Sequence, residues 1–189
     1  SRSFEADGDI SHSDNPHLRL FTVVKRRSPD VKTDLDYAAH QWVQAEPDSV
    51  RKFSAVGYYF GRSLEEALHG KGVPVGIIHT SWGGSPAEVW MREDVLKADA
   101  EYNSMIMEPG LAGAAKSAEA IKLWEAEKKA TEAKGEKFTK NRPGQPWRPA
   151  ELYNGMLANI IPYGIRGAIW YQGESNAGRA WQYRRLYAD

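Results

Sequence analysis

Three short apolar runs along the chain predict strands, and the second and third have the composition of buried strands. Residues 18–24 (LRLFTVV) follow an arm of polar residues without a period, residues 73–79 (VPVGIIH) follow a turn, and residues 165–171 (IRGAIWY) lie near the end. Apolar runs of this length, bounded by turn residues, are typical of strands that are covered on both faces. We therefore expect three strands, the second and third of which lead into polar, glycine-containing loops.

Helical spacing is strongest between the first two of these runs. Over residues 55–69 the apolar positions recur three and four residues apart, which predicts an amphipathic helix. Ser54 is a suitable N-cap, and Gly70 can end the helix. Residues 28–52, which contain two prolines and several aspartates, are predicted to be a loop.

The remainder of the chain carries further helical patterns. They cover residues 87–97, 116–134, 152–161 and 183–189. Residues 116–134 are rich in Ala, Lys and Glu and have only a narrow apolar stripe, so this helix should be largely exposed to solvent. Residues 135–149 contain several prolines and predict an irregular connection.

The order of these elements indicates the fold class. Strands alternate with helices, which predicts an α/β fold with a parallel sheet covered by helices. In such sheets, functional sites form beyond the carboxyl ends of the strands. We therefore expect the loops at residues 79–86 and 172–178 to converge on one site, with a helical excursion at about residues 92–149 as a wall beside it.

The composition favours a folded chain and excludes several functions. The 189 residues include 25 Lys and Arg against 25 Asp and Glu, 41% hydrophobic residues, seven Trp and no Cys. The zero net charge gives no general attraction to nucleic acid or an anionic membrane, so we expect neither as a partner. No run approaches the roughly 20 apolar residues of a membrane helix. Without Cys there is no disulfide, thiolate metal site or cysteine nucleophile.

Two groups of residues offer hydrogen-bond donors for a developing negative charge. Gly83 and Gly84 let backbone N–H groups approach a ligand, because no side chain covers them. Gln172 and Asn176 add side-chain amides, and Glu174 adds a carboxylate. A tight turn at the glycines and helix capping in the second group are structural alternatives that stay open.

Other reactive groups have less support from the sequence. There is no Gly-Lys-Ser/Thr phosphate loop, and the five His show no metal-ligand spacing, so we expect no metal and no cofactor. His79, beside the glycines, has either a site role or a structural one. Ser175 follows a predicted strand but lacks the second Gly of a nucleophile elbow. We ascribe the pairing of Asp9 with His12 in the polar arm to chance.

Long motifs in this chain resemble one known family. Residues 53–62, 75–90, 152–156 and 169–179 read FSAVGYYFGR, VGIIHTSWGGSPAEVW, LYNGM and IWYQGESNAGR. In this order and spacing they resemble the sialate O-acetylesterase (SASA) family, a group of carbohydrate esterases within the SGNH hydrolases, over most of residues 17–189. The resemblance implies a flavodoxin-like three-layer α/β sandwich that hydrolyses acetyl esters on sugars through a serine nucleophile.

The resemblance also implies roles for particular residues. Some of them would contribute to an oxyanion hole or support it, and three aromatic residues would line the sugar pocket. The oxyanion-hole residues are Gly83, Gly84 and Gln172, the supporting residues are Glu174 and Asn176, and the aromatic residues are Trp82, Trp90 and Tyr171. Aromatic residues at strand ends also serve as core, and this alternative stays open for all three.

The family's nucleophile and catalytic His have no counterpart at the expected places. The motif Gly-Gln-Ser-Asn should precede Ser1, and Asp-x-x-His should follow Asp189. We therefore expect residues 1–189 to be the central part of a single esterase domain, inactive as an isolated fragment. The alternative is a noncatalytic sugar-binding or partner-binding module on the same scaffold. The resemblance implies an O-acetylated sugar or glycan as substrate and a secreted or periplasmic location; the oligomeric state stays open.

Overall fold

The computed structural model describes residues 6–33 and 41–189 and divides the chain into two compact units. The sheet unit comprises Ser1–Lys25 and Thr33–Trp82, and the helical unit comprises Arg26–Lys32 and Gly83–Asp189. Each unit has a hydrophobic core of its own. That residues 1–189 belong to a single esterase domain stays a prediction.

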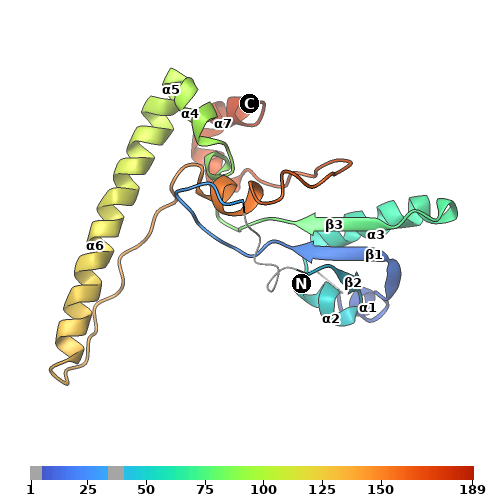
Figure 1. Ribbon diagram of the computed structural model, residues 1–189, viewed down its shortest axis with the longest axis horizontal. Coiled ribbons are helices and arrows are strands. Elements are labelled where there is room, and N and C mark those ends of the chain that lie inside the picture. The colour runs from blue at the N-terminus through green and yellow to red at the C-terminus, as the bar shows by residue number, and fades with distance from the viewer. Residues whose placement is uncertain (1–5, 34–40) are drawn as a thin grey trace. The chain divides into compact units, whose positions relative to one another are not determined.

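Among the described residues, three strands form one mixed sheet in the order β2-β1-β3 (Figure 1). β1 (Asn15–Thr22) and β3 (Val75–His79) run parallel, with Leu18 opposite Val75. β2 (Val43–Ala45) pairs antiparallel with β1. The first two predicted strands and their parallel pairing are therefore confirmed, whereas β2 lies in the stretch that we expected to be a loop.

Helix α3 (Ala55–Leu68) forms where the apolar spacing predicts it. Ser54 caps it as expected, its Oγ accepting a hydrogen bond of 3.2 Å from a backbone N–H of the first turn. The helix does not end at Gly70, because a 3₁₀ turn, η1 (His69–Lys71), continues it to Gly72. The φ of Gly72 is 64°, a left-handed conformation that glycine adopts without a steric penalty.

The core of the sheet unit lies between the sheet and its helices. A Cβ atom on Gly61 would come within 2.6 Å of Ile77 and 3.1 Å of Leu18, so α3 lies very close to β1 and β3. A bulkier residue at this position would force helix and sheet apart. The buried core residues are Ala6, Ile10, Leu18, Leu20, Ala45, Val50, Phe53, Tyr58 and Val75.

Two short helices form where we expected irregular chain. α1 (Ala6–Ser11) lies in the polar arm, where its first residue and Ile10 are buried in the core. α2 (Pro47–Lys52) lies in the predicted loop and begins with a capping box between Glu46 and Ser49. Two buried residues fix α1, and one capping box begins α2. Each helix has only six residues, which is too short for a period of apolar positions to be recognised in the sequence.

Helices of different lengths are the main regular elements of the helical unit. They are α4 (Glu93–Ala98), α5 (Ala100–Tyr102), α6 (Glu108–Glu132) and α7 (Ala180–Leu186), with a π-helical segment, η3 (Asn103–Met107), between α5 and α6. Their core consists of Leu96, Tyr102, Ile106, Met107 and Leu186. α6 confirms the expected exposed helix and begins earlier than expected. None of the helices in the described ranges has both the length and the apolar content for crossing a membrane.

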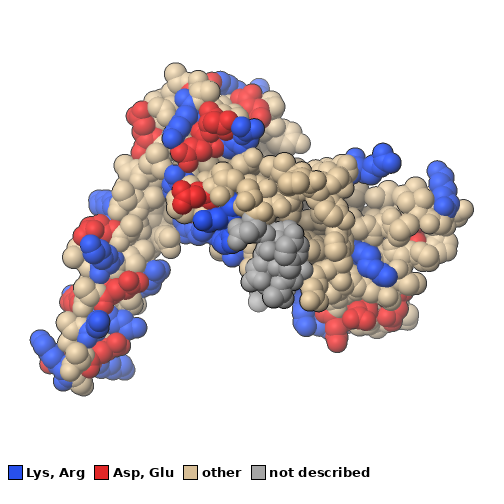
Figure 2. All heavy atoms as spheres, viewed as in Figure 1, with Lys and Arg blue, Asp and Glu red and all other residues tan. Residues whose placement is uncertain are grey.

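Residues 135–149 form an irregular connection, as predicted, and this connection runs back along α6 (Figure 1). Trp124 Nε1 donates to the Lys140 carbonyl at 3.0 Å, and Ser117 Oγ donates to the Gly144 carbonyl at 2.6 Å. Figure 2 shows basic and acidic side chains interspersed along the outside of α6. The connection thus covers part of the surface of α6 and accepts hydrogen bonds from its side chains.

The prediction of a third strand is wrong. Residues 165–171 are irregular and pair with no strand in the described part of the chain. Ile165 is 64% exposed and Tyr171 is 83% exposed. An extended segment becomes a strand only when a neighbour takes up its N–H and C=O groups, and the described residues of the helical unit form no such neighbour.

Two predicted helices form only in part. Residues 87–97 contain a 3₁₀ turn, η2 (Ala87–Val89), and α4 begins only at Glu93. Residues 152–161 contain a π-helical segment, η4 (Tyr153–Leu157), followed by turns. The spacing of apolar residues identified helical backbone at both places, but short segments of different pitch replace one continuous α-helix.

Contacts with the segment Arg26–Lys32 explain the shape of η4. Lys32 N donates to the Asn154 carbonyl at 2.9 Å, and Asn154 Nδ2 donates to the Pro29 carbonyl at 2.9 Å. A Cβ atom on Gly155 would lie 2.0 Å from the carbonyl oxygen of Arg26. Only glycine fits at this position, so the close approach of the two backbones depends on it.

Candidate active site

The glycine loop, Gly83–Pro86, follows β3 in the sequence and belongs to the helical unit. Gly84 has a φ of 76°, a conformation that is strained for any residue with a side chain, even though no atom lies within 4 Å of the place that a Cβ atom would occupy. The Gly84 carbonyl accepts a hydrogen bond of 2.9 Å from Trp147 Nε1. The turn alternative therefore explains the second glycine, and the exposed backbone also remains accessible to a ligand.

The glycine loop and residues 172–179 converge, as the sequence predicts. Gln172 Nε2 donates to the Ser85 carbonyl at 3.3 Å and to Asn176 Oδ1 at 2.7 Å. Asn176 Oδ1 also accepts a hydrogen bond of 2.8 Å from the backbone N–H of Ala87. Side-chain amides from the second segment thus hold the backbone of the first, across more than 80 residues of sequence.

A buried carboxylate lies next to this junction. Glu88 is 6% exposed, and its Oε2 accepts a hydrogen bond of 2.9 Å from Asn176 Nδ2. Its Oε1 is paired with the guanidinium of Arg179, which in turn donates to Gln182 Oε1 at 2.7 Å. A buried carboxylate needs such partners because it has lost its hydration. The pair neutralises charge beside the glycine loop.

The sequence pattern alone gave no separate role to Glu88 and Arg179. Both lie inside the motifs that carry the family resemblance, but neither stands at a predicted strand end. A Glu between Ala and Val in an apolar stretch was the available signal, because a carboxylate among core residues needs a cation. Nothing local in the sequence identifies which cation that is.

The donors of Gln172 point inward in this structure. Both hydrogens of its side-chain amide are directed at acceptors, the Ser85 carbonyl and Asn176 Oδ1. Its Oε1 is buried, without a hydrogen-bond partner among the described residues. Gln172 therefore holds the glycine loop, and its role in an oxyanion hole, which needs one hydrogen to face a reacting oxygen, stays a prediction.

Of the other residues named in this segment, two lie at the surface and one is buried. Glu174 and Ser175 are exposed at the start of the 3₁₀ helix η5 (Glu174–Arg179), whereas Asn176 in the same helix is 1% exposed. The alternation follows from the helix, which turns one side chain toward the glycine loop and its neighbours toward solvent. Asn176 is therefore buried at the junction, and its role as a supporting residue stays a prediction.

The three aromatic residues have different environments. Trp90 is 9% exposed, and its indole nitrogen donates to Ser85 Oγ at 2.8 Å. Tyr171 is 83% exposed. Trp82 is half-buried in the sheet unit, with the Lys25 ammonium 5.4 Å from the centre of its ring. The burial of Trp90 favours the core alternative for this residue; a sugar-binding role for the three stays a prediction.

His79, at the end of β3, forms a hydrogen bond of 2.5 Å between its Nε2 and Ser81 Oγ. Burial, with a smaller contribution from the Lys25 charge, lowers the pKa of His79 and so favours the neutral imidazole. Its Nδ1 is buried and has no partner among the described residues. The pair thus lacks the third group that orients the base in a serine triad.

Asp9 and His12 form no catalytic pair. The Asp9 carboxylate accepts hydrogen bonds from the Tyr59 hydroxyl at 2.6 Å and from Arg62 at 3.0 Å. The first of these contacts is the main cause of the lowered pKa of Asp9. His12 Nδ1 instead contacts the Gly8 carbonyl. Within the described ranges, no group of three His, Asp or Glu side chains is placed to hold a metal ion.

Comparison with known proteins shows one consistent set of relatives. No family model matches the chain. The sialate O-acetylesterase of Rattus norvegicus is 28% identical over 180 residues, which are 90% of this chain and 31% of the relative. The human sialate O-acetylesterase is 25% identical over 165 residues, 84% of this chain and 25% of the relative. The chain thus spans less than a third of the length of these relatives.

A solved structure shares the fold. A carbohydrate acetylesterase from Xanthomonas citri aligns over 96% of this chain and 31% of its own, with a TM-score of 0.64 and 27% sequence identity. The mixed sheet and its helices are consistent with an incomplete α/β fold of the SGNH hydrolase type, as expected. Sequence relatives and fold together support the sialate O-acetylesterase-like family for this chain.

Proposed function

We propose that the protein containing this chain hydrolyses O-acetyl esters of carbohydrates, and that this chain supplies one wall of its active site. The observation that carries the proposal is the junction of the two loops. Asn176 and Gln172 bond the backbone of residues 85–87, so that the glycine loop and residues 172–179 form one surface. The names of the relatives support an acetylated carbohydrate as the substrate class.

The proposed reaction is serine acyl transfer. The serine oxygen bonds to the acetyl carbonyl carbon while a histidine takes the serine proton, and the carbonyl oxygen becomes an oxyanion. The sugar oxygen then leaves with that proton, and water releases acetate from the acetyl-enzyme by the same two steps. The serine and histidine are expected outside residues 1–189, in the motifs Gly-Gln-Ser-Asn and Asp-x-x-His.

The contribution of this chain is electrostatic. Backbone N–H groups at Gly83 and Gly84 can approach the oxyanion because no side chain shields them, and Gln172 is the candidate side-chain donor. A carboxylate near a developing oxyanion would oppose it, and the pairing of Glu88 with Arg179 removes that penalty. Rigid placement matters because preorganised donors need no reorientation during the reaction.

Expression of the complete reading frame tests this proposal. The protein should release acetate from O-acetylated sialic acid and from 4-nitrophenyl acetate, and its sequence should contain Gly-Gln-Ser-Asn before and Asp-x-x-His after residues 1–189. Binding of an O-acetylated sugar in a calorimeter without acetate release would support the noncatalytic module instead. The absence of both motifs from the complete sequence would contradict the esterase.

The location of the protein is a separate proposal. We propose that it acts in the periplasm or outside the cell, where glycans are accessible, and the resemblance to the family supports this. Fractionation of the cells that make it, followed by immunodetection, tests the location. Detection in the cytoplasmic fraction alone would contradict it.

A further inference from the structure

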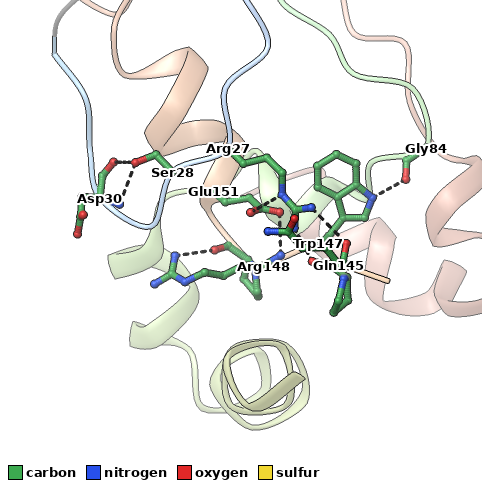
Figure 3. A network of polar contacts seen from close by, with 10 residues as sticks. Arg27, Ser28, Asp30, Gly84, Gln145, Trp147, Arg148 and Glu151 are labelled. Atoms are coloured by element: carbon green, nitrogen blue, oxygen red, sulfur yellow. Dashed lines mark hydrogen bonds and ion pairs between the residues drawn. The ribbon is translucent and has the colours of Figure 1, made fainter. Parts of the chain in front are cut away.

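Trp147 connects the long excursion to the glycine loop. It lies near the end of the irregular connection that returns from α6, and its indole N–H donates to the Gly84 carbonyl at 2.9 Å (Figure 3). The Arg27 guanidinium lies over the same indole, 4.8 Å from the centre of the ring. A cation over a Trp face is attracted to it, so the ring is held from its face as well as its edge.

Arg27 is itself fixed by several acceptors. Its Nε donates to Glu151 Oε2 at 2.8 Å, its Nη1 donates to the Gln145 carbonyl at 3.2 Å, and its Nη2 donates to the Pro146 carbonyl (Figure 3). Glu151 is 4% exposed, and its Oε1 accepts a hydrogen bond of 2.8 Å from the backbone N–H of Arg148. The planar guanidinium has donors on several sides, so these contacts define its plane and thereby the position of the indole.

We propose that Trp147 is a positioning residue for the glycine loop, and that Arg27 and Glu151 hold Trp147 in place. This inference rests on the proposed esterase function. Trp147 anchors the Gly84 carbonyl, and Gln172 anchors the next carbonyl, that of Ser85, at 3.3 Å. Two successive carbonyls are therefore held by side chains from different parts of the chain.

The planarity of the peptide bond converts this anchoring into an orientation of N–H groups. The described residues contain no cis peptide bond, so the carbonyl of Gly84 and the N–H of Ser85 point in opposite directions. Fixing the carbonyl toward Trp147 therefore fixes the plane of the Gly84–Ser85 peptide, and the candidate donor N–H of Gly84 is separated from that plane only by the φ and ψ of Gly84. Gly84 has left-handed φ and no side chain to restrict it, so without the indole contact the peptide has more freedom to rotate.

Trp124 provides a matched control within the same excursion. Its indole N–H also donates to a backbone carbonyl, that of Lys140, at 3.0 Å, and the Lys128 ammonium lies 5.5 Å from the centre of its ring. Both tryptophans thus combine an indole-to-carbonyl bond with a cation over the ring. Of these two tryptophans, Trp147 bonds the glycine loop and Trp124 does not, so a comparison of the two isolates the effect of that contact.

The experiment replaces each tryptophan by phenylalanine in the complete protein. Trp147→Phe keeps an aromatic ring beside Arg27 but removes the indole N–H, and Trp124→Phe makes the same change elsewhere. Loss of one oxyanion donor costs about a hundredfold to a thousandfold in turnover, and a misplaced donor costs less. We expect kcat for acetyl ester hydrolysis to fall about ten- to a hundredfold in Trp147→Phe with KM within about twofold, and both to be unchanged in Trp124→Phe.

Hydrogen exchange of the peptide spanning residues 80–90 provides a readout that does not need activity. Exchange there should accelerate in Trp147→Phe and not in Trp124→Phe. Unchanged exchange in Trp147→Phe would overturn the anchoring, and faster exchange with unchanged kcat would overturn its role in positioning. A wild-type protein without esterase activity would instead contradict the proposed function, and the exchange comparison would still decide whether Trp147 anchors the loop.

Discussion

Replacing Asn176 by alanine removes the side chain that joins the two loops of the candidate site. Asn176 is 1% exposed; it accepts hydrogen bonds of 2.8 Å from Ala87 N and 2.7 Å from Gln172 Nε2, and it donates one of 2.9 Å to Glu88 Oε2. Alanine would leave two donors and one carboxylate oxygen without this partner. Each unsatisfied buried group costs about 1 to 3 kcal/mol, and more where a charge is involved.

Partial relaxation of the loops and entry of water will recover some of this free energy. We therefore expect Asn176→Ala to lower the free energy of unfolding by about 3 to 5 kcal/mol, a large part of the roughly 5 to 15 kcal/mol that is typical of a domain. Urea unfolding followed by tryptophan fluorescence measures the loss. Asn176→Asp keeps the acceptor but places a second carboxylate beside Glu88, so we expect a similar loss at neutral pH.

Asn103 offers the control for this measurement. Its side chain donates one exposed hydrogen bond of 2.9 Å, to Glu108, from a helical segment. Asn103→Ala should change the free energy of unfolding by no more than about 0.5 kcal/mol, because the exposed bond is replaced by water and alanine favours helix. A loss below about 1 kcal/mol in Asn176→Ala would refute the reasoning that the junction depends on its buried bonds.

Two further predictions concern packing and pH. A Cβ on Gly110 would lie 2.5 Å from the Pro149 ring, whereas Gly113 in the same helix has nothing within 4 Å. Gly110→Ala should therefore lower the free energy of unfolding, whereas Gly113→Ala should raise it by up to about 1 kcal/mol. The melting temperatures of the two variants should move in opposite directions, and an equal response would contradict the packing. Burial, with the hydrogen bond to Asp189, raises the pKa of Tyr102 to about 12. The unfolded chain loses this proton near pH 10, so stability should fall as pH rises from about 10 to 12. The fall should be smaller in Tyr102→Phe, as measured by urea unfolding at each pH; equal slopes would contradict it.

The parts of the fold that the sequence predicted are those with local causes. The apolar runs of β1 and β3 and the spacing in α3 act over a few residues, and Ser54 caps its helix through a bond three residues away. The segment 165–171 has the same local character, but its pairing depends on a neighbouring strand. Local composition cannot determine whether such a neighbour is present.

The candidate site shows the same limit. The sequence singled out Gln172 and Asn176 because amide side chains after an apolar run are unusual enough to suggest a site. It could not identify Glu88 as the partner of Asn176, 88 residues earlier, because the contact arises only when the two segments fold together. The contact of Trp147 with the glycine loop could not be predicted either, because nothing in a proline-rich connection indicates which carbonyl the indole will bond.

The central claim is that the glycine loop and residues 172–179 together stabilise an oxyanion. The steady-state kinetics of Gln172→Ala in the complete protein test it most directly, with Gln41→Ala, an exposed glutamine of the sheet unit, as the control. The account predicts that kcat falls about a hundredfold to a thousandfold in Gln172→Ala while KM changes little, and that Gln41→Ala keeps both values. An unchanged kcat in Gln172→Ala would contradict it.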